Sequence, residues 1–360
     1  MPNAHKLRCA VIGTGTFAEV CHVPGLQSHP RAEVVAICGG ADRARKLADK
    51  FGVPDVYTDV EELCARDDVD AVTIVTRNVD HKAQALAALA HGKHVFCEKP
   101  LGMNPAEVRE MVVAAEVSGR VNQVAFVFRY NYGVQELRRR VLQGDIGQPF
   151  YCRVQYDNWD GLKPDWKVGW GEKQALAGAG VLFNLGSHLF DIARHVLGPI
   201  ESAIGFTHQV PRTRPDARTG APTAVETDDL FNAWMGHTSG VRGQIFVSRV
   251  TPPFTQNGYL EVVGPEGALK AALSRGAWDF LKRSTPAAPE WVDLPLPPEA
   301  GDQQPHSLGL MMRSFVDACL KGEIDPEVDA SFQDGLAGQR AMAAVLKSES
   351  LRRWILLAEV

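Results

Sequence analysis

The stretch Cys9-Ala10-Val11-Ile12-Gly13-Thr14-Gly15-Thr16-Phe17-Ala18 decides the fold. A short apolar run, typical of a buried strand, passes into a glycine turn, and a helix is expected to follow. In such a G-x-G-x-x-A turn the first glycine allows a tight bend and the second lets a pyrophosphate approach the backbone. The final alanine allows close packing of helix on strand, and the helix N-terminus faces the phosphates. Because the turn directly follows a strand, it predicts a dinucleotide site.

Strand-length apolar runs alternate with helix-like stretches in the first third of the chain. Asn104-Pro105 is typical of a helix start, and Gly92 and Gly119 lie where helices should end. The alternation predicts an α/β class with a doubly wound parallel sheet, a Rossmann domain, over residues 1–127. The expected strands are Arg8–Ile12, Glu33–Cys38, Asp70–Val75, His94–Cys97 and Gln123–Phe128, and the expected helices are Asp42–Phe51, Val60–Ala65, Asp80–Ala90 and Ala106–Val117.

The pattern changes after the turn at Gly144–Gly147, where strands follow one another without intervening helices. One helix, Gly180–Leu197, interrupts them, and two helices, His306–Lys321 and Ala330–Lys347, close the chain. We therefore predict an α+β domain with a mostly antiparallel open sheet over residues 128–360, which binds substrate and forms oligomers. Its expected strands are Phe150–Trp159, Ile200–Thr207, Thr227–Met235, Arg242–Val250, Gly258–Val263 and Trp278–Lys282, with loops at Pro211–Thr223 and Ser284–Gln304.

The overall composition is that of a globular protein of two domains. With 360 residues, 45% of them hydrophobic and 22% charged, the chain can bury sizeable cores. A net charge of −5 argues against nucleic-acid and membrane-surface partners, which need a basic face. The seven cysteines form no C-x-x-C pair, so neither zinc nor a disulfide framework is expected. The first apolar run is too short for a signal peptide or a spanning helix, so we expect a cytoplasmic protein.

The expected cofactor site departs from the NAD pattern. An acidic residue about 20 residues after the glycine turn binds the ribose of NAD, but the second strand here ends in Cys38-Gly39-Gly40. The missing acid and the nearby Arg43 favour the additional phosphate of NADP, although a basic, solvated helix face would explain Arg43 equally well. Thr76, Asn78 and His81 follow the end of another strand, where a doubly wound sheet binds ligands.

Two further segments carry candidate chemistry. Glu98-Lys99-Pro100 follows a strand; the lysine can reach the nicotinamide, and the glutamate can hold either the lysine or the cofactor ribose. On a regular helix, Asn184, His188 and Asp191 share one face, which makes His188 an oriented proton acceptor. The plain structural alternatives are an exposed Glu-Lys ion pair and a satisfied helix histidine. No third ligand accompanies His188 and Asp191, so no metal is predicted.

Together these segments resemble the Gfo/Idh/MocA family, which is named for glucose-fructose oxidoreductase, inositol dehydrogenase and rhizopine catabolism. The resemblance covers nearly the whole chain. It implies an enzyme that uses NAD or NADP to oxidise or reduce a secondary alcohol of a sugar, glycoside or cyclitol. It also implies that the Lys99–Pro100 bond is cis. The resemblance rests on the glycine turn, Thr76-x-Asn78-x-x-His81, Gly92-Lys93-His94-Val95, Glu98-Lys99-Pro100, Arg129-Tyr130 and the Gly180–His188 helix.

By this resemblance Lys99 and His188 are the catalytic pair. We assign His188 as the general base and Lys99 as the group that binds and polarises the reacting oxygen, although the two roles can be exchanged. Asn184 is expected to hydrogen-bond a neighbouring hydroxyl. The open face of the second sheet is expected to be covered in a homodimer or homotetramer. The predicted cofactor-binding residues are Gly13, Thr14, Gly15, Thr16, Phe17, Ala18, Arg43, Thr76, Asn78, His81, Glu98 and Lys99. The predicted substrate-binding residues, besides Lys99, Asn184 and His188, are Arg129, Tyr130, Asn131, Asp157, Trp159, Trp166 and Lys167, whose aromatic and polar groups suit a polyhydroxylated ring.

Three residues depart from the family pattern. Asn184 stands where many members carry aspartate, Arg77 replaces the usual proline, and Gly39 replaces the acid that selects NAD. Asn184 leaves open a catalytically silent, nucleotide-binding regulator with the same fold, although the presence of Lys99 and His188 argues against it. Reduction of a non-sugar carbonyl or of a tetrapyrrole is the second alternative.

Overall fold

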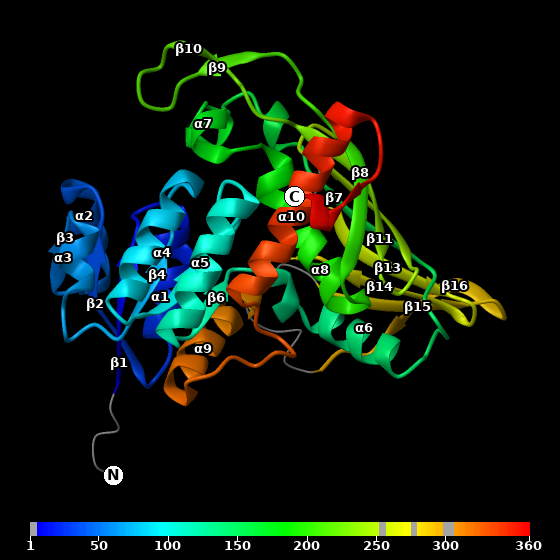
Figure 1. Cartoon of the computed structure of the whole chain (residues 1–360), viewed down its shortest axis with the longest axis horizontal. Helices are drawn as coiled ribbons and strands as arrows, with labels where there is room; N and C mark the ends of the chain where they lie inside the picture. Colours follow the sequence, from blue (N-terminus) through cyan, green and yellow to red (C-terminus); the bar gives the residue numbers. More distant parts are fainter. Residues whose placement is uncertain (1–5, 252–256, 275–278, 298–305) are drawn as a thin grey trace. The chain divides into compact units, whose positions relative to one another are not determined.

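The computed structural model describes residues 6–251, 257–274, 279–297 and 306–360. The chain divides into two compact units (Figure 1): Met1–Phe126 with Leu308–Leu336, and Val127–Ser307 with Ala337–Val360. The prediction that everything after residue 127 belongs to the second domain is therefore wrong for Leu308–Leu336. This segment joins the first unit because its helix buries Phe315 against Phe96, with ring centroids 5.3 Å apart.

The first unit contains a six-stranded parallel sheet in the order β3-β2-β1-β4-β5-β6. This order confirms the predicted doubly wound Rossmann sheet. The short β3 was not predicted, and the predicted strand Gln123–Phe128 ends at Val124 because a 3₁₀ turn follows. The strands are β1 (Leu7–Ile12), β2 (Ala32–Cys38), β3 (Asp55–Tyr57), β4 (Ala71–Ile74), β5 (His94–Cys97) and β6 (Asn122–Val124).

Helices cover both faces of this sheet. One face packs its apolar side chains against α3, α4 and α5, and Phe96 on the other face contacts α9. Asn104 accepts a hydrogen bond from the Glu107 backbone N–H at 3.0 Å, which confirms the predicted helix start. The helical segments are the π-helix η1 (Ala18–His22), α1 (Val23–Gln27), α2 (Ala41–Phe51), α3 (Val60–Cys64), η2 (Asn78–Asp80), α4 (His81–Ala90), α5 (Pro105–Ser118) and α9 (His306–Lys321).

The second unit is built on a nine-stranded sheet in the order β16-β15-β14-β13-β7-β12-β11-β8-β17. Its neighbours are antiparallel except β7 and β12, which confirms the predicted mostly antiparallel sheet. The predicted loop Ser284–Gln304 is wrong where β16 forms, and Trp278, the first residue of the last predicted strand, lies outside the described residues. The strands are β7 (Tyr151–Asp157), β8 (Ile200–His208), β11 (Leu230–His237), β12 (Arg242–Ser248), β13 (Asn257–Gly264), β14 (Gly267–Ala272), β15 (Leu281–Thr285), β16 (Ala288–Leu294) and β17 (Ile355–Leu356).

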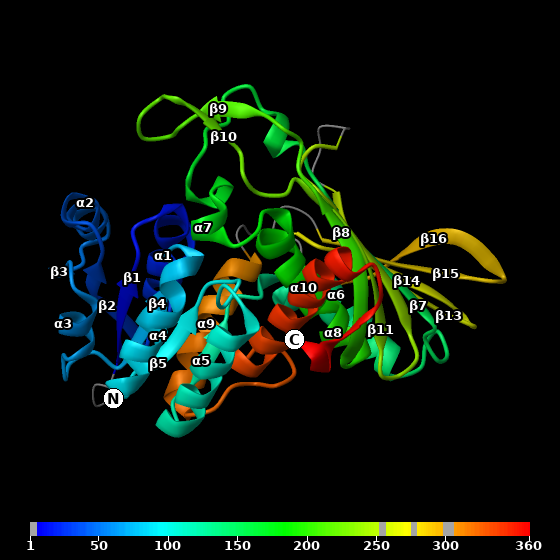
Figure 2. The same ribbon diagram turned by 45° about the horizontal axis from the view of Figure 1, so that its top comes forward.

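Helix α8 packs on one face of this sheet, with Phe190 stacked on Phe231 of β11 at 6.2 Å (Figure 2). The apolar stretch Gln174–Leu197 is long enough to span a membrane, but 78% of its most apolar window is buried, so we interpret it as a core helix. A two-stranded hairpin, β9 with β10, extends away from the sheet (Figures 1 and 2). The remaining segments are η3 (Val127–Tyr130), α6 (Tyr132–Leu142), η4 (Asp160–Leu162), η5 (Trp170–Glu172), α7 (Gln174–Ala177), the π-helix η6 (Leu182–Gly186), α8 (Ser187–Leu197), β9 (Thr213–Pro215), β10 (Pro222–Ala224), α10 (Phe332–Leu351) and η8 (Leu357–Glu359).

Candidate active site

The glycine turn of the first unit has the geometry that a dinucleotide needs. Gly13 has a φ of +123°, and a Cβ on it would lie 2.3 Å from the Val75 carbonyl oxygen, so only glycine fits. A Cβ on Gly15, in contrast, would have no described atom within 4 Å. Ala18 is fully buried where the following helix packs on the sheet. Gly13 thus shapes the turn, while Gly15 leaves room beside the backbone where a pyrophosphate fits.

At the end of β2, Thr14 and Gly39 occupy one small space. A Cβ on Gly39 would lie 2.7 Å from the methyl carbon of Thr14, so a longer side chain at position 39 would displace Thr14. The Arg43 guanidinium lies close to Gly40, with Nη2 3.7 Å from the position of a Cβ there. Arg43 is exposed and, within the described part of the chain, forms no ion pair. The end of β2 therefore has the exposed Arg43 cation nearby and no carboxylate at position 39.

The residues after β4 support the neighbouring backbone. The Thr76 hydroxyl donates to Gln84 Oε1 at 2.6 Å, and the buried Asn78 begins η2. His81 is fully buried and donates from Nδ1 to the Pro100 carbonyl oxygen at 2.9 Å. Nδ1 of His81 thus supports the backbone after β5, and a contact between His81 and the cofactor stays a prediction. Burial lowers the pKa of His81, which keeps the ring neutral.

Lys99 follows β5 at the carboxyl edge of the parallel sheet, where doubly wound folds bind ligands. The Lys99–Pro100 bond is cis, as the family resemblance implies. Glu98 accepts the Lys99 backbone N–H at Oε2 (3.2 Å), and its Oε1 lies 3.2 Å from Nε2 of His22. Burial alone would raise the pKa of Glu98, but the His22 hydrogen bond and the charge of Lys99 hold that pKa below its usual value. Glu98 is thus an ionised group that orders the backbone of Lys99.

In the second unit, His188 lies on the face of the sheet that α8 covers. Its ring centroid lies 4.9 Å from that of Phe128, which in turn packs 5.8 Å from Tyr156 of β7. His188 is buried, whereas Asn184, one turn earlier, is exposed. Asn184 lies in the π-helix η6, whose wider turn changes the rotation between residues from that of a regular helix. A face shared by Asn184, His188 and Asp191 stays a prediction.

The carboxylate of Asp191 is bound to Arg129 rather than to His188. Arg129 donates from Nε to Oδ2 at 2.7 Å and from Nη2 to Oδ1 at 2.5 Å, and both side chains are at most 2% exposed. Arg129 thus stabilises the interior of the second unit, and its place in the substrate wall stays a prediction. Asn131 is also structural, since its Nδ2 donates to the Ser274 carbonyl at 2.8 Å, and Tyr130 is buried.

Asp157 lies on the opposite face of the sheet from His188. Side chains alternate along β7, so Tyr156 faces α8 while Gln155 and Asp157 face the open side. Gln155 donates a hydrogen bond to Asp157 Oδ2, and burial raises the pKa of Asp157. Asp157 and Tyr156 thus point to opposite sides of β7, and a role of Asp157 in substrate binding stays a prediction.

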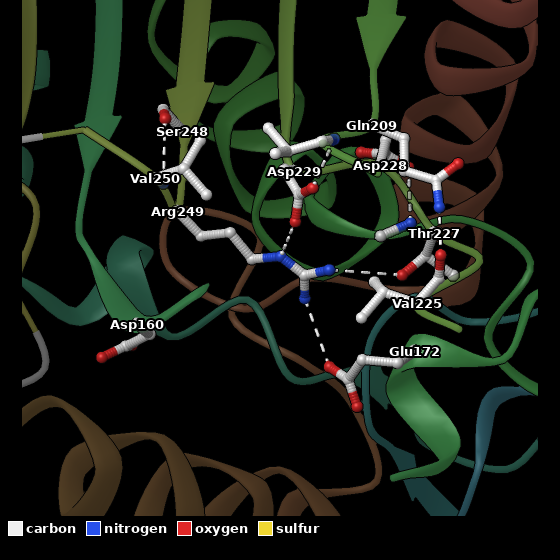
Figure 3. Close-up of polar contacts among 12 residues, drawn as sticks. Asp160, Glu172, Gln209, Val225, Thr227, Asp228, Asp229, Ser248, Arg249 and Val250 are labelled. Atoms are coloured by element: carbon white, nitrogen blue, oxygen red, sulfur yellow. Dashed lines mark hydrogen bonds and ion pairs between the residues drawn. The ribbon is translucent and has the colours of Figure 1, made fainter. Parts of the chain in front are cut away.

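A buried charged cluster that sequence reasoning missed holds the Trp166 segment in place. Figure 3 shows the Arg249 guanidinium bonded to Asp229 (2.7 Å), Glu172 (3.2 Å) and Thr227 (3.4 Å). The carbon at the centre of the same guanidinium lies 5.3 Å from the centre of the Trp166 ring. We call Trp166, Glu172, Thr227, Asp229 and Arg249 the Arg249 cluster. The half-buried Trp166 is thus a fixed surface, whereas Lys167 beside it is exposed.

Asp228 is a second residue that the sequence did not reveal. Its carboxylate accepts the backbone N–H groups of Gly180 (2.5 Å) and Leu182 (2.9 Å), so it caps the helix that carries His188. A Cβ on Gly180 would lie 2.0 Å from the Asp228 carbonyl oxygen, which explains the glycine. The sequence signal for these residues was the adjacent pair Asp228-Asp229, directly before β11. Carboxylates are buried only with hydrogen-bond or ion-pair partners, so such a pair beside a strand predicts a polar network.

A cavity of about 430 Å³ lies on the open side of the sheet, away from His188. Its β11 residues, Asn232 and Trp234, alternate with Phe231 and Ala233, which face the core.

Among the residues that the structure describes, no group of three His, Cys, Asp or Glu side chains is placed to bind a metal. The two predicted catalytic residues belong to different units, Lys99 to the first and His188 to the second.

The sequence matches two protein-family models. Residues 7–126 match the model described as "Oxidoreductase family, NAD-binding Rossmann fold", and residues 134–270 match that of the GFO/IDH/MocA C-terminal domain. The chain belongs to the Gfo/Idh/MocA family. It is an oxidoreductase with an NAD-binding Rossmann fold, as the resemblance predicted.

Several curated relatives of this Gfo/Idh/MocA protein are named for activities on sugars and cyclitols. The chain is 33% identical to 1,5-anhydro-D-fructose reductase of Ensifer adhaerens, over 73% of this chain and 74% of the relative. It is 33% identical to D-glucoside 3-dehydrogenase of Escherichia coli over 54% and 55% of the two chains. It is 27% identical to scyllo-inositol 2-dehydrogenase (NAD(+)) of Bacillus subtilis over 74% and 73%. A levoglucosan dehydrogenase crystallised with NADH has the same fold, with a TM-score of 0.89 at 21% identity over 98% of this chain and 99% of that one.

Proposed function

We propose that this protein transfers a hydride between a nicotinamide cofactor and a secondary alcohol carbon of a sugar, glycoside or cyclitol. The observation that carries the proposal is the position of Lys99, ordered by Glu98 at the carboxyl edge of the Rossmann sheet. Both candidate catalytic side chains are present, which favours an enzyme over a silent nucleotide-binding regulator. The named activities of the relatives support a polyhydroxylated ring as substrate.

The protein residues supply proton transfer and orientation. In the oxidation direction Lys99 binds the hydroxyl oxygen, and His188 accepts the hydroxyl proton while the carbinol C–H bond breaks. A dinucleotide held by the glycine turn would supply the hydride acceptor: its nicotinamide would take the carbinol hydrogen with both electrons of the C–H bond, so that the alcohol becomes a ketone. Asn184 is exposed on η6 and offers an amide to a neighbouring hydroxyl. Trp166, fixed by Arg249, offers an aromatic face of the kind that packs against a sugar ring.

We propose that NADP serves at least as well as NAD. No carboxylate stands at position 39 to repel the additional phosphate of NADP, and the Arg43 cation lies beside Gly40. The glycine turn accommodates the pyrophosphate that both cofactors share.

The decisive experiment is a substrate panel with each cofactor, followed by absorbance of the reduced nicotinamide. It includes 1,5-anhydro-D-fructose with NADPH or NADH, and methyl glucosides, levoglucosan and scyllo-inositol with NADP or NAD. Lys99→Ala should lower turnover of the best substrate by roughly 10²–10⁴-fold while cofactor affinity stays within about threefold. Near-parent turnover by this variant would remove Lys99 from the mechanism. No turnover with any panel member, but tight cofactor binding, would favour the silent regulator.

We further propose that the open face of the nine-stranded sheet forms a homo-oligomer. Large aromatic side chains stand exposed there, including Phe206 (50% exposed) and Trp234 (43%) beside the cavity. Exposed apolar patches of this kind mark protein interfaces, and closed dimers or tetramers are the usual result. Light scattering after size exclusion tests this, and a monomer at micromolar concentration would contradict it.

A further inference from the structure

The Glu98–Pro100 segment is held from two sides by two buried histidines. Nε2 of His22 lies 3.2 Å from Glu98 Oε1, just before Lys99. Nδ1 of His81 lies 2.9 Å from the Pro100 carbonyl oxygen, just after it. Both rings are 0% exposed and come from different elements, η1 and α4. Lys99 is therefore bracketed by two hydrogen bonds from outside its own strand.

His22 reaches Glu98 from a π-helical turn that directly follows the glycine loop. A π turn inserts one residue into a helix and so redirects the side chains around it. The His22 ring packs edge-on against Phe96 of β5, with centroids 5.6 Å apart and an interplanar angle of 76°. Nδ1 of His22 is buried without a hydrogen-bond partner among the described residues, so the ring proton belongs on Nε2, which donates to Glu98.

His81 has the opposite tautomer. The Pro100 carbonyl can only accept a hydrogen bond, so the proton must be on Nδ1 of His81. The second oxygen of Glu98 accepts the Lys99 backbone N–H at 3.2 Å. The two histidines thus act on the backbone on either side of Lys99 rather than on its ammonium group.

We propose that His22 and His81 are positioning residues that fix Lys99 for hydride transfer, with His22 coupling the dinucleotide-binding helix to the lysine. The inference rests on the proposed catalytic role of Lys99. Misplacing a catalytic group by about 1 Å can lower a rate by roughly 10²-fold. Loss of either hydrogen bond should therefore slow the chemical step while the glycine turn still binds cofactor.

The test uses amide side chains that reproduce one histidine nitrogen each. Glutamine places its amide near the Nε2 position and asparagine near the Nδ1 position. His22→Gln and His81→Asn should therefore keep turnover within about threefold of the parent enzyme, whereas His22→Leu and His81→Leu should lose roughly 10–100-fold. The crossed variants His22→Asn and His81→Gln should behave like the leucine variants. All are assayed with the best panel substrate.

Two readouts separate positioning from general loss of structure. With NADPH or NADH deuterated at C4 in the ketone-reduction direction, the primary isotope effect on kcat should rise in the leucine and crossed variants, because chemistry becomes rate-limiting. The dissociation constant of the reduced cofactor, followed by its fluorescence, should stay within about threefold of the parent. His29→Leu is the matched control, since His29 is also buried and pairs with Asp317 (3.3 Å) in the same unit, away from Glu98. It should keep the parent turnover and isotope effect.

Folded leucine and crossed variants with parent turnover and isotope effect would overturn the inference. If the leucine variants do not fold, the crossed and matched amide variants decide, because equal turnover in those two sets would overturn it as well. The Lys99→Ala enzyme keeps the two proposals apart. An inactive Lys99→Ala enzyme beside fully active histidine variants would refute only this inference, whereas an active one would refute the proposed function.

Discussion

Arg129 holds Asp191 through two parallel hydrogen bonds of 2.7 and 2.5 Å in the interior of the second unit. The pair joins η3 to α8, and η3 also carries Phe128, which packs on the His188 ring. Asp191→Asn would leave the Arg129 charge buried without its counter-ion. We expect the free energy of unfolding, measured in urea, to fall by about 3–5 kcal/mol.

The control for this prediction is an exposed pair of the same geometry. Arg353 and Glu359 also form a two-bond contact, at 2.7 and 3.1 Å, but on the surface. Glu359→Gln should therefore cost no more than about 1 kcal/mol. Equal losses in Asp191→Asn and Glu359→Gln would show that burial of the Arg129–Asp191 pair has no energetic consequence.

The two glycines of the cofactor turn should separate stability from binding. Gly13→Ala should lower the unfolding free energy by more than about 1–3 kcal/mol, because φ is +123° and the new Cβ would meet the Val75 carbonyl. Gly15→Ala should leave the unfolding temperature unchanged, because its Cβ meets no described atom, and should weaken cofactor binding by about tenfold or more. Thermal unfolding and cofactor titration test both. A Gly15→Ala protein that binds normally would place the pyrophosphate elsewhere.

The sequence predicted those parts of the fold and site that depend on short-range pattern. The strand before Gly13, the alternation up to α5 and the position of Lys99 after β5 all follow from periodicity and turn residues. The return of Leu308–Leu336 to the first unit could not be predicted this way. It depends on a long-range contact between Phe315 and Phe96, and periodicity contains no information about which sheet a helix packs on.

Three predicted site residues have local surroundings that the sequence pattern did not reveal. The π-helix η6 altered the rotation that a regular helix predicts between Asn184 and Asp191. Asp157 directly follows Tyr156 on β7, so the two side chains point to opposite faces of the sheet, and Tyr156 is the one that packs on Phe128. The sequence pattern predicts that the polar ring of His81 binds the cofactor. In the structure this ring donates to a backbone carbonyl, a contact that no residue pattern reveals.

The Arg249 cluster should control affinity for the sugar and not for the cofactor. Arg249→Lys would lose the planar fork that bonds Asp229 and Glu172 and supports the Trp166 ring. We expect KM for the sugar to rise roughly tenfold, or about 1.4 kcal/mol, with an unchanged cofactor dissociation constant. The exposed Arg218 in the neighbouring hairpin provides the control, since Arg218→Lys should change neither constant. An unchanged sugar KM in Arg249→Lys would remove the cluster from substrate binding.

Cofactor choice should depend on Arg43 and on the space that Thr14 and Gly39 share. Arg43→Ala should lower kcat/KM for NADP by about tenfold, equivalent to about 1.4 kcal/mol, and leave the value for NAD within about threefold. Arg45, on the same helix, forms an ion pair with Asp49 at 3.7 Å, so we expect it to take no part in cofactor binding. Arg45→Ala should therefore change neither value.

The complementary change introduces the acid that NAD enzymes carry. Gly39→Asp alone should impair both cofactors, because its Cβ would lie 2.7 Å from the Thr14 methyl carbon. Thr14→Ala removes that methyl group, so the double variant should accept the aspartate and prefer NAD, whose ribose hydroxyls it can bind while repelling the phosphate of NADP. The measurement is kcat/KM for both cofactors in the parent and each variant. Two outcomes would show that a group other than Arg43 selects the cofactor: a parent preference for NAD above about tenfold, or unchanged NADP kinetics in the Arg43→Ala enzyme. The next residue to replace would then be Asp42, in the first turn of α2.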